Sequence, residues 1–181
     1  MKKSNPVLKL VLGALFLALA LVLPFLTGQI PEIGSMLCPM HLPVLIAGFV
    51  CGGPIAAIVG FLAPLLRFLM FSMPPIYPVG LSMAFELLTY GLVSGVMYSH
   101  VFKKKNIGSV YASLLTAMVA GRVVWGIVRL VLAGIGRQAG SFTFAAFISG
   151  AITTAVPGIL VQLILVPVVV LALKKAKLID A

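Results

Sequence analysis

Four ionisable side chains lie within long apolar stretches of the sequence, where a charge is costly: Arg67, Glu86, Arg122 and Arg129. Arginine donates paired N–H groups to carboxylates, and a glutamate accepts from hydroxyls, so these residue types are suited to binding a polar small molecule. Arg122 and Arg129 are seven residues apart and share nearly the same face of a helix. Three arginines against one glutamate leave an excess of positive charge. This excess predicts a site that binds an anion.

Aromatic residues and a histidine near these charges are further candidates for the same site. Trp125 lies between the two arginines of one predicted helix, Tyr90 is one turn from Glu86, Tyr77 lies in a proline-rich segment, and His41 begins an apolar segment. Two interpretations stay open. The aromatic rings are equally compatible with packing against lipid, and the charges with a structural network in which Glu86 pairs with one arginine.

Catalytic and metal chemistry find little support in the sequence. HExxH, GxSxG and Walker A motifs are absent, and Glu32 and Glu86 are the only glutamates. Cys38 and His41 resemble half of a metal site, but no further cysteine, histidine or acidic ligand lies near them in the sequence. We therefore expect a binding protein rather than an enzyme, without a metal or another cofactor.

The composition indicates that membrane helices position these residues. Hydrophobic residues make up 62% of the chain and charged residues 9%, with a mean hydropathy of +1.24, whereas a soluble domain carries roughly a quarter of charged residues. A length of 181 residues provides about six spans of roughly 20 residues each. We predict an all-α integral membrane protein in which residues 1–181 form a single transmembrane domain.

Apolar runs between proline and glycine signals predict six helices, over residues 7–25, 40–50, 55–71, 79–102, 109–133 and 142–173. The first apolar run continues beyond Ala18-Leu19-Ala20, so we expect a retained helix and not a cleaved signal. A loop containing Glu32 is expected before the second helix, and Pro157 and Pro167 predict kinks in the last one.

The lysines predict how these helices cross the membrane. All nine fall into three clusters at the ends of apolar segments: Lys2, Lys3 and Lys9; Lys103, Lys104 and Lys105; Lys174, Lys175 and Lys177. Lysine near the end of a span favours the cytoplasmic side. Six crossings place every cluster and both termini in the cytoplasm, whereas five crossings would put the middle cluster outside. The net charge of +10 is therefore assigned to topology and lipid headgroups, not to nucleic acid.

Small residues on the first helix predict a surface for another helix. Ala14 and Ala18 form a small-xxx-small pair, which lets helix backbones approach closely, although packing within the bundle would use the same pattern. With this pair, the sequence resembles the substrate-binding S component of energy-coupling factor (ECF) vitamin transporters. The resemblance also covers the runs Met36-Leu37-Cys38-Pro39-Met40-His41-Leu42-Pro43-Val44-Leu45, Gly48-Phe49-Val50-Cys51-Gly52, Pro64-Leu65-Leu66-Arg67 and Met73-Pro74-Pro75. These runs are similar to the group usually assigned to pantothenate.

The resemblance implies a six-helix S-component bundle in the bacterial cytoplasmic membrane. It implies that a vitamin binds from outside, and that a separate transmembrane coupling subunit and two ATPase subunits drive its import. Ala14 and Ala18 would then face the coupling subunit. Pantothenate is a monoanion with hydroxyls and an amide, which suits the arginines and Glu86. Niacin, pyridoxine and hydroxymethylpyrimidine are the alternatives within the family, and an intramembrane enzyme or an anion channel is the alternative outside it.

Overall fold

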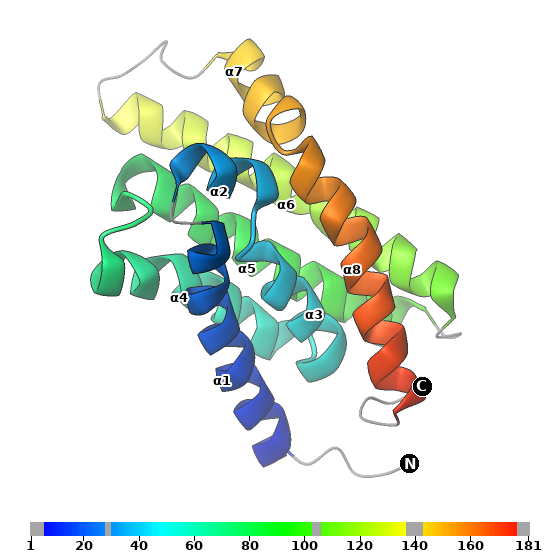
Figure 1. The fold of residues 1–181 in the computed structure, drawn as a ribbon. Coiled ribbons are helices and arrows are strands. Elements are labelled where there is room, and N and C mark those ends of the chain that lie inside the picture. Colours follow the sequence, from blue (N-terminus) through cyan, green and yellow to red (C-terminus); the bar gives the residue numbers. More distant parts are fainter. Residues whose placement is uncertain (1–5, 28–29, 103–105, 137–142, 177–181) are drawn as a thin grey trace.

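The computed structural model describes residues 6–27, 30–102, 106–136 and 143–176, and these residues form a bundle of helices (Figure 1). The lysines at 2, 3, 103–105 and 177, on which part of the predicted topology depends, lie outside the described residues. Within the described ranges there is no β-strand, which confirms the predicted all-α class.

Each predicted segment contains one long helix: α1 Pro6–Val22, α3 His41–Cys51, α4 Gly53–Phe71, α5 Leu81–Val96, α6 Ile107–Ile135 and α8 Val156–Lys175. The bounds of α1, α3, α4 and α6 agree with the predicted ones to within about three residues. Shorter elements connect them: a 3₁₀ turn at Leu23–Thr27, the helices α2 Pro31–Leu37 and α7 Phe144–Ile148, and π-helical turns at Ile76–Gly80, Met97–Val101 and Ser149–Thr153. The π-helical turns at Ile76–Gly80 and Met97–Val101 adjoin the two ends of α5.

Two predicted segments differ from the structure. The expected loop before the second long helix contains α2, which begins at Pro31 with Glu32 in its first turn, two features that favour a helix start. The predicted single helix over residues 142–173 is wrong as well. Its N-terminal part ends near Thr154, and Pro157 lies in the first turn of α8, where the missing N–H of proline costs nothing.

Among the described residues, five helices are long and apolar enough to cross a membrane. They are Pro6–Leu26, Gly53–Phe71, Ile76–Val101, Ile107–Ile135 and Val156–Lys175. The exception among the six is α3, whose 11 residues extend only about 16 Å, roughly half of the hydrocarbon core. Most of its side chains are buried, because α1, α4, α5 and α8 surround it. Six crossings thus stay a prediction.

Contacts between helices fix the directions in which they run. Gly13 of α1 lies beside Ile55 of α4, and Arg67 of α4 donates to the carbonyl of Leu21 near the end of α1, so these two helices run in the same direction. Between α4 and α5, contacts join the start of one helix to the end of the other, so this pair is antiparallel. Figure 1 shows α8 running back along α6 toward the end of the bundle where α1 begins.

Glycines allow α4 and α5 to approach closely. A Cβ placed on Gly91 would lie 2.4 Å from the backbone oxygen of Ala56, and one on Gly60 would lie 2.3 Å from that of Leu87. Such distances leave no room for a side chain, and the obstacle is backbone rather than a movable side chain. The close approach matters for the site, because α4 and α5 carry two of its charged residues.

We expect Gly91→Leu to destabilise the protein, since a leucine there must push α4 and α5 apart. Overpacking of this kind costs about 1 to 3 kcal/mol or more, which corresponds to a fall of roughly 5 °C in the unfolding temperature of a protein of this size. Thermal unfolding of the detergent-solubilised protein measures it. The matched control is Gly134→Leu on α6, where no atom lies within 4 Å of the added Cβ. Equal unfolding temperatures for the two variants would contradict the prediction.

Candidate functional site

A buried carboxylate joins three helices at one end of the bundle. Glu86 of α5 is only 1% exposed, and its Oε1 lies 3.0 Å from Nη1 of Arg122 on α6 and 3.4 Å from Nε2 of His41 on α3. Tyr90, one turn along α5, is fully buried and places its ring edge-on to the ring of His41, with 5.2 Å between centroids. These four residues form the Glu86 cluster.

The local sequence explains how Arg122 reaches Glu86. Gly121, the preceding residue, lies directly against Tyr90, and a Cβ there would be 2.0 Å from the tyrosine ring. A larger residue would hold α6 away from α5 and lengthen the ion pair. Arg122 also donates from Nη2 to the sulfur of Cys38 at 3.8 Å. Burial raises the pKa of the Cys38 thiol, so at neutral pH the sulfur is an uncharged acceptor.

A cavity of about 640 Å³ adjoins this cluster. Its walls come from many segments of the chain, and most of the lining residues are apolar. They are Pro24, Ile30, Glu32, Gly34, Cys38, Pro39, Met40, His41, Arg67, Met73, Pro74, Pro75, Val79, Met83, Glu86, Arg122, Trp125, Gly150 and Thr154. Such a volume is typical of pockets that enclose a small organic molecule.

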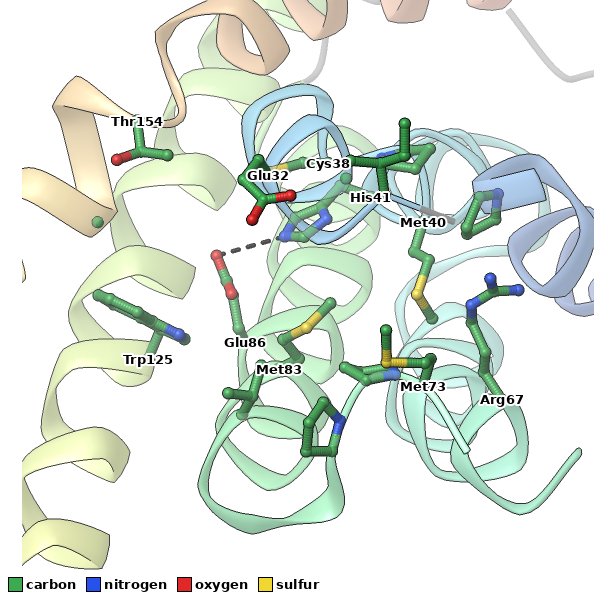
Figure 2. A pocket seen from close by; sticks show the side chains of 18 of the residues that line it. Glu32, Cys38, Met40, His41, Arg67, Met73, Met83, Glu86, Trp125 and Thr154 are labelled. Carbon is green, nitrogen blue, oxygen red and sulfur yellow. Dashed lines mark ion pairs between the residues drawn. The ribbon is translucent and has the colours of Figure 1, made fainter. Parts of the chain in front are cut away.

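The polar groups of the cavity are divided between two ends. Figure 2 shows Trp125 and Thr154 on one side of the view and Arg67 with Met40 and Met73 on the other, with Glu86 and Met83 between them. Glu86 lies nearer to Trp125 than to Arg67 in this view, so Glu86 and Trp125 belong to a polar and aromatic end. Arg67 belongs to an end walled by methionines and prolines.

Arg67 has an unusual set of neighbours for a buried guanidinium. Its side chain is on α4, only 3% of the residue is exposed, and Nη1 donates to the backbone oxygen of Leu21. The rings of Phe25 and Phe71 lie 4.9 and 5.3 Å from its Cζ, in cation–π contact. In the described part of the chain, no carboxylate lies within ion-pair distance of Arg67.

The structure brings five of the eight predicted ligand-binding residues to the cavity wall: His41, Arg67, Glu86, Arg122 and Trp125. The other three lie elsewhere. Tyr90 is behind the wall, against His41. The hydroxyl of Tyr77 donates to the backbone oxygen of Leu132, and Arg129 contacts the ring of Trp125, with its Cζ 5.8 Å from the ring centroid.

Several lining residues were missed by the sequence reasoning. Glu32 was assigned to a loop, and Met40, Met73 and Met83 look like any other apolar residues in a membrane protein. The available signal was positional, because Met40 is next to His41 and Met73 begins the proline-rich segment that ends α4. No spacing rule relates Met83 to the other two.

The distribution of charge also differs from the prediction. The sequence indicated an excess of arginine over glutamate, but Arg129 is not part of the wall and Glu32 is. Among the described residues, two arginines and two glutamates line the cavity, so their formal charges balance. An anion site must therefore depend on where the charges are placed and not on their number.

The arrangement can bind a molecule but offers little for chemical catalysis. The buried carboxylate of Glu86 is held by an arginine and a histidine, which keeps it from acting freely as a base. Within the described ranges, no three His, Cys, Asp or Glu side chains gather closely enough to hold a metal ion. The fold and the cavity together define a helical membrane protein with a cavity of the size that encloses a small molecule.

A comparison with protein families identifies the family of this membrane protein. The family model for the ECF transporter, substrate-specific component matches residues 8–170, which is most of the chain, so the protein belongs to this family. No curated protein and no solved structure matches the sequence. The family consists of transporter components and not of enzymes, and its members bind small-molecule substrates and work with membrane-embedded partners.

We expect Arg122→Gln to destabilise the protein without any ligand present, because it leaves the Glu86 carboxylate buried beside His41 alone. Removing one partner of a buried ion pair costs roughly 3 to 5 kcal/mol, so the unfolding temperature should fall by about 10 °C. Thermal unfolding measures this, with Arg129→Gln, outside the cluster, as the control.

The double variant Arg122→Gln, Glu86→Gln isolates the pair. It should be more stable than Arg122→Gln alone, because the uncompensated charge is then gone. If the effects of the two substitutions on the unfolding temperature simply added, the 3.0 Å contact between Glu86 and Arg122 would contribute no coupling. That result would contradict a stabilising ion pair between these residues.

Proposed function

We propose that this protein captures a vitamin from outside the cell as the S component of an ECF importer, with pantothenate as its ligand. The observation that carries the proposal is the cavity of about 640 Å³ beside the Glu86 cluster, in a chain that belongs to the substrate-specific family. Pantothenate has a carboxylate, an amide, two hydroxyls and a dimethyl-substituted carbon. The arginines, Glu86 and the methionine walls offer a partner to each of these groups.

Niacin is the second candidate, because its flat aromatic ring could stack against Trp125 while an arginine binds its carboxylate. Pyridoxine and hydroxymethylpyrimidine fit the charges less well, since neither carries a carboxylate for Arg67. An intramembrane enzyme is less favoured, because the family consists of transporter components. A passive channel is less favoured because the backbones of α4 and α5 pack directly against each other at Gly60 and Gly91, which leaves no room for a pore between these two helices.

Three features support a cavity that opens outward from a six-crossing bundle with cytoplasmic termini. The helices alternate in direction as successive crossings require. Lys9 near the start of α1 and Lys174 and Lys175 at the end of α8 belong to one end of the bundle. The cavity is at the other end, beside Pro24 beyond α1 and Thr154 before α8. By the positive-inside rule, the lysine end is cytoplasmic.

The exposed side of α1 supports a docking site for the coupling subunit, which would act with two ATPase subunits. Ala14 and Ala18 are exposed, whereas Gly13, the neighbouring small residue, is buried against Ile55. The alanine pair is therefore not used for packing against α4. In the bacterial cytoplasmic membrane, such a pair lets a partner helix approach closely.

We expect the purified protein to bind pantothenate by itself and to accumulate it only together with its partners. Ala14→Leu with Ala18→Leu should abolish uptake into cells or proteoliposomes that contain all subunits, while the affinity of the isolated chain for pantothenate changes less than about threefold. Gly134→Leu, at an open position of α6, is the control for uptake. ATP-driven uptake by this chain alone, or normal uptake by the double variant, would refute the proposed partnership.

A further inference from the structure

We propose that Arg67 binds the carboxylate of the ligand, at the end of the cavity opposite Trp125, and that the Glu86 cluster binds uncharged polar groups. The inference rests on the proposed function and specifies how the ligand lies in the site. It also names the substrate class: an anion whose carboxylate is separated by an apolar body from hydroxyl or amide groups.

The first step compares the two arginines of the wall. Arg122 has a carboxylate partner at 3.0 Å, and a ligand carboxylate there would approach Glu86, a like charge in a buried setting. Arg67 has no such partner among the described residues. A second anion is therefore repelled at Arg122 and favoured at Arg67.

The second step concerns the donors of Arg67. A guanidinium has five N–H groups, and one of them is occupied by the oxygen of Leu21. Phe25 and Phe71 stabilise the charge through their ring faces without accepting these N–H groups in ordinary hydrogen bonds. Because Arg67 also lines the cavity, its remaining donors are the ones that a carboxylate could take in the bidentate geometry.

The third step concerns the space between the two ends. Met83 lies between the two ends, and Met40 and Met73 lie toward Arg67 (Figure 2). Their thioether side chains are apolar and adapt to irregular shapes. They favour an aliphatic or compact apolar body over a charged one. The Glu86 cluster is already paired internally, so it has hydrogen bonds to offer but little net charge.

The alternative is that Arg67 only holds α1 against α4 through Leu21. Both roles predict that losing Arg67 weakens the protein, so stability alone does not separate them. Charge selectivity does, because a structural residue affects an acid and its uncharged analogue alike, whereas an anion-binding residue affects the acid far more.

The test is a titration monitored by the fluorescence of Trp125, the only tryptophan of the chain and a residue of the cavity wall. The probes are two matched pairs, pantothenate with its alcohol analogue and nicotinate with nicotinamide. The proteins are the wild type, Arg67→Gln, Arg67→Lys and, as a control at an open position of α6, Gly134→Leu.

For the pair that binds, we expect the wild type to prefer the acid, and Arg67→Gln to lose about tenfold or more of its affinity for the acid. Its affinity for the neutral analogue should change less than about threefold. Arg67→Lys should recover part of the loss, and Gly134→Leu should resemble the wild type. Equal losses for acid and analogue in Arg67→Gln, or a wild type that prefers the neutral probe, would overturn the inference.

If neither pair binds, mass spectrometry of the molecule that copurifies with the wild type decides. A neutral or cationic molecule overturns the role of Arg67 and leaves the S-component function in place. A different carboxylate is titrated against its own amide in the same four proteins. If the wild type together with its partner subunits took up no ligand, that result would instead count against the proposed function.

Discussion

Burial of the Glu86 carboxylate is the constraint on which the rest of the site depends. A charge taken out of water inside a helix bundle is strongly destabilising unless donors surround it. Arg122 and His41 approach one oxygen of Glu86 from two other helices, so α3, α5 and α6 must meet at this depth. The short α3 is the helix that depends most on this junction, because its first residue is His41 and few of its side chains reach the surface.

Close helix approach is the means by which the charges meet. Gly121 lets α6 approach Tyr90, and Gly91 lets α4 approach α5, so the small residues and the charged residues belong to one arrangement. Without the driving force that water gives to burial of apolar surface, packing and polar contacts hold membrane helices together. A glycine beside an ion pair therefore contributes to the site even though it touches no ligand.

The helices could be predicted from the sequence because length and apolarity are local properties. Several residues of the cavity wall could be predicted as well. A charge in an apolar helix needs a partner or a cavity, which is why Arg67, Glu86 and Arg122 were recognised. Which arginine pairs with Glu86 could not be predicted, since it depends on which residues of different helices meet. For the same reason the wall methionines and Glu32 were missed. Arg129 and Tyr77 were predicted to be ligand-binding residues, but neither lines the cavity. The break before Pro157 was misjudged because a proline is compatible both with a kink and with a new helix.

The two arginines of the wall show why counting charges was a poor guide to the site. Arg122 is neutralised by its own protein, which makes the cluster stable when the cavity is empty and leaves it suited to hydroxyls and amides. Arg67 is held by a backbone oxygen and two aromatic rings, which stabilise a buried cation without cancelling its charge. A site balanced in total charge can thus still select an anion, provided that the acidic partners lie at one end and the uncancelled cation at the other. If Arg67 binds the ligand as proposed, the ligand carboxylate is the negative partner that the described protein residues do not provide. The apolar wall between the two ends then sets the length of a molecule that can reach both.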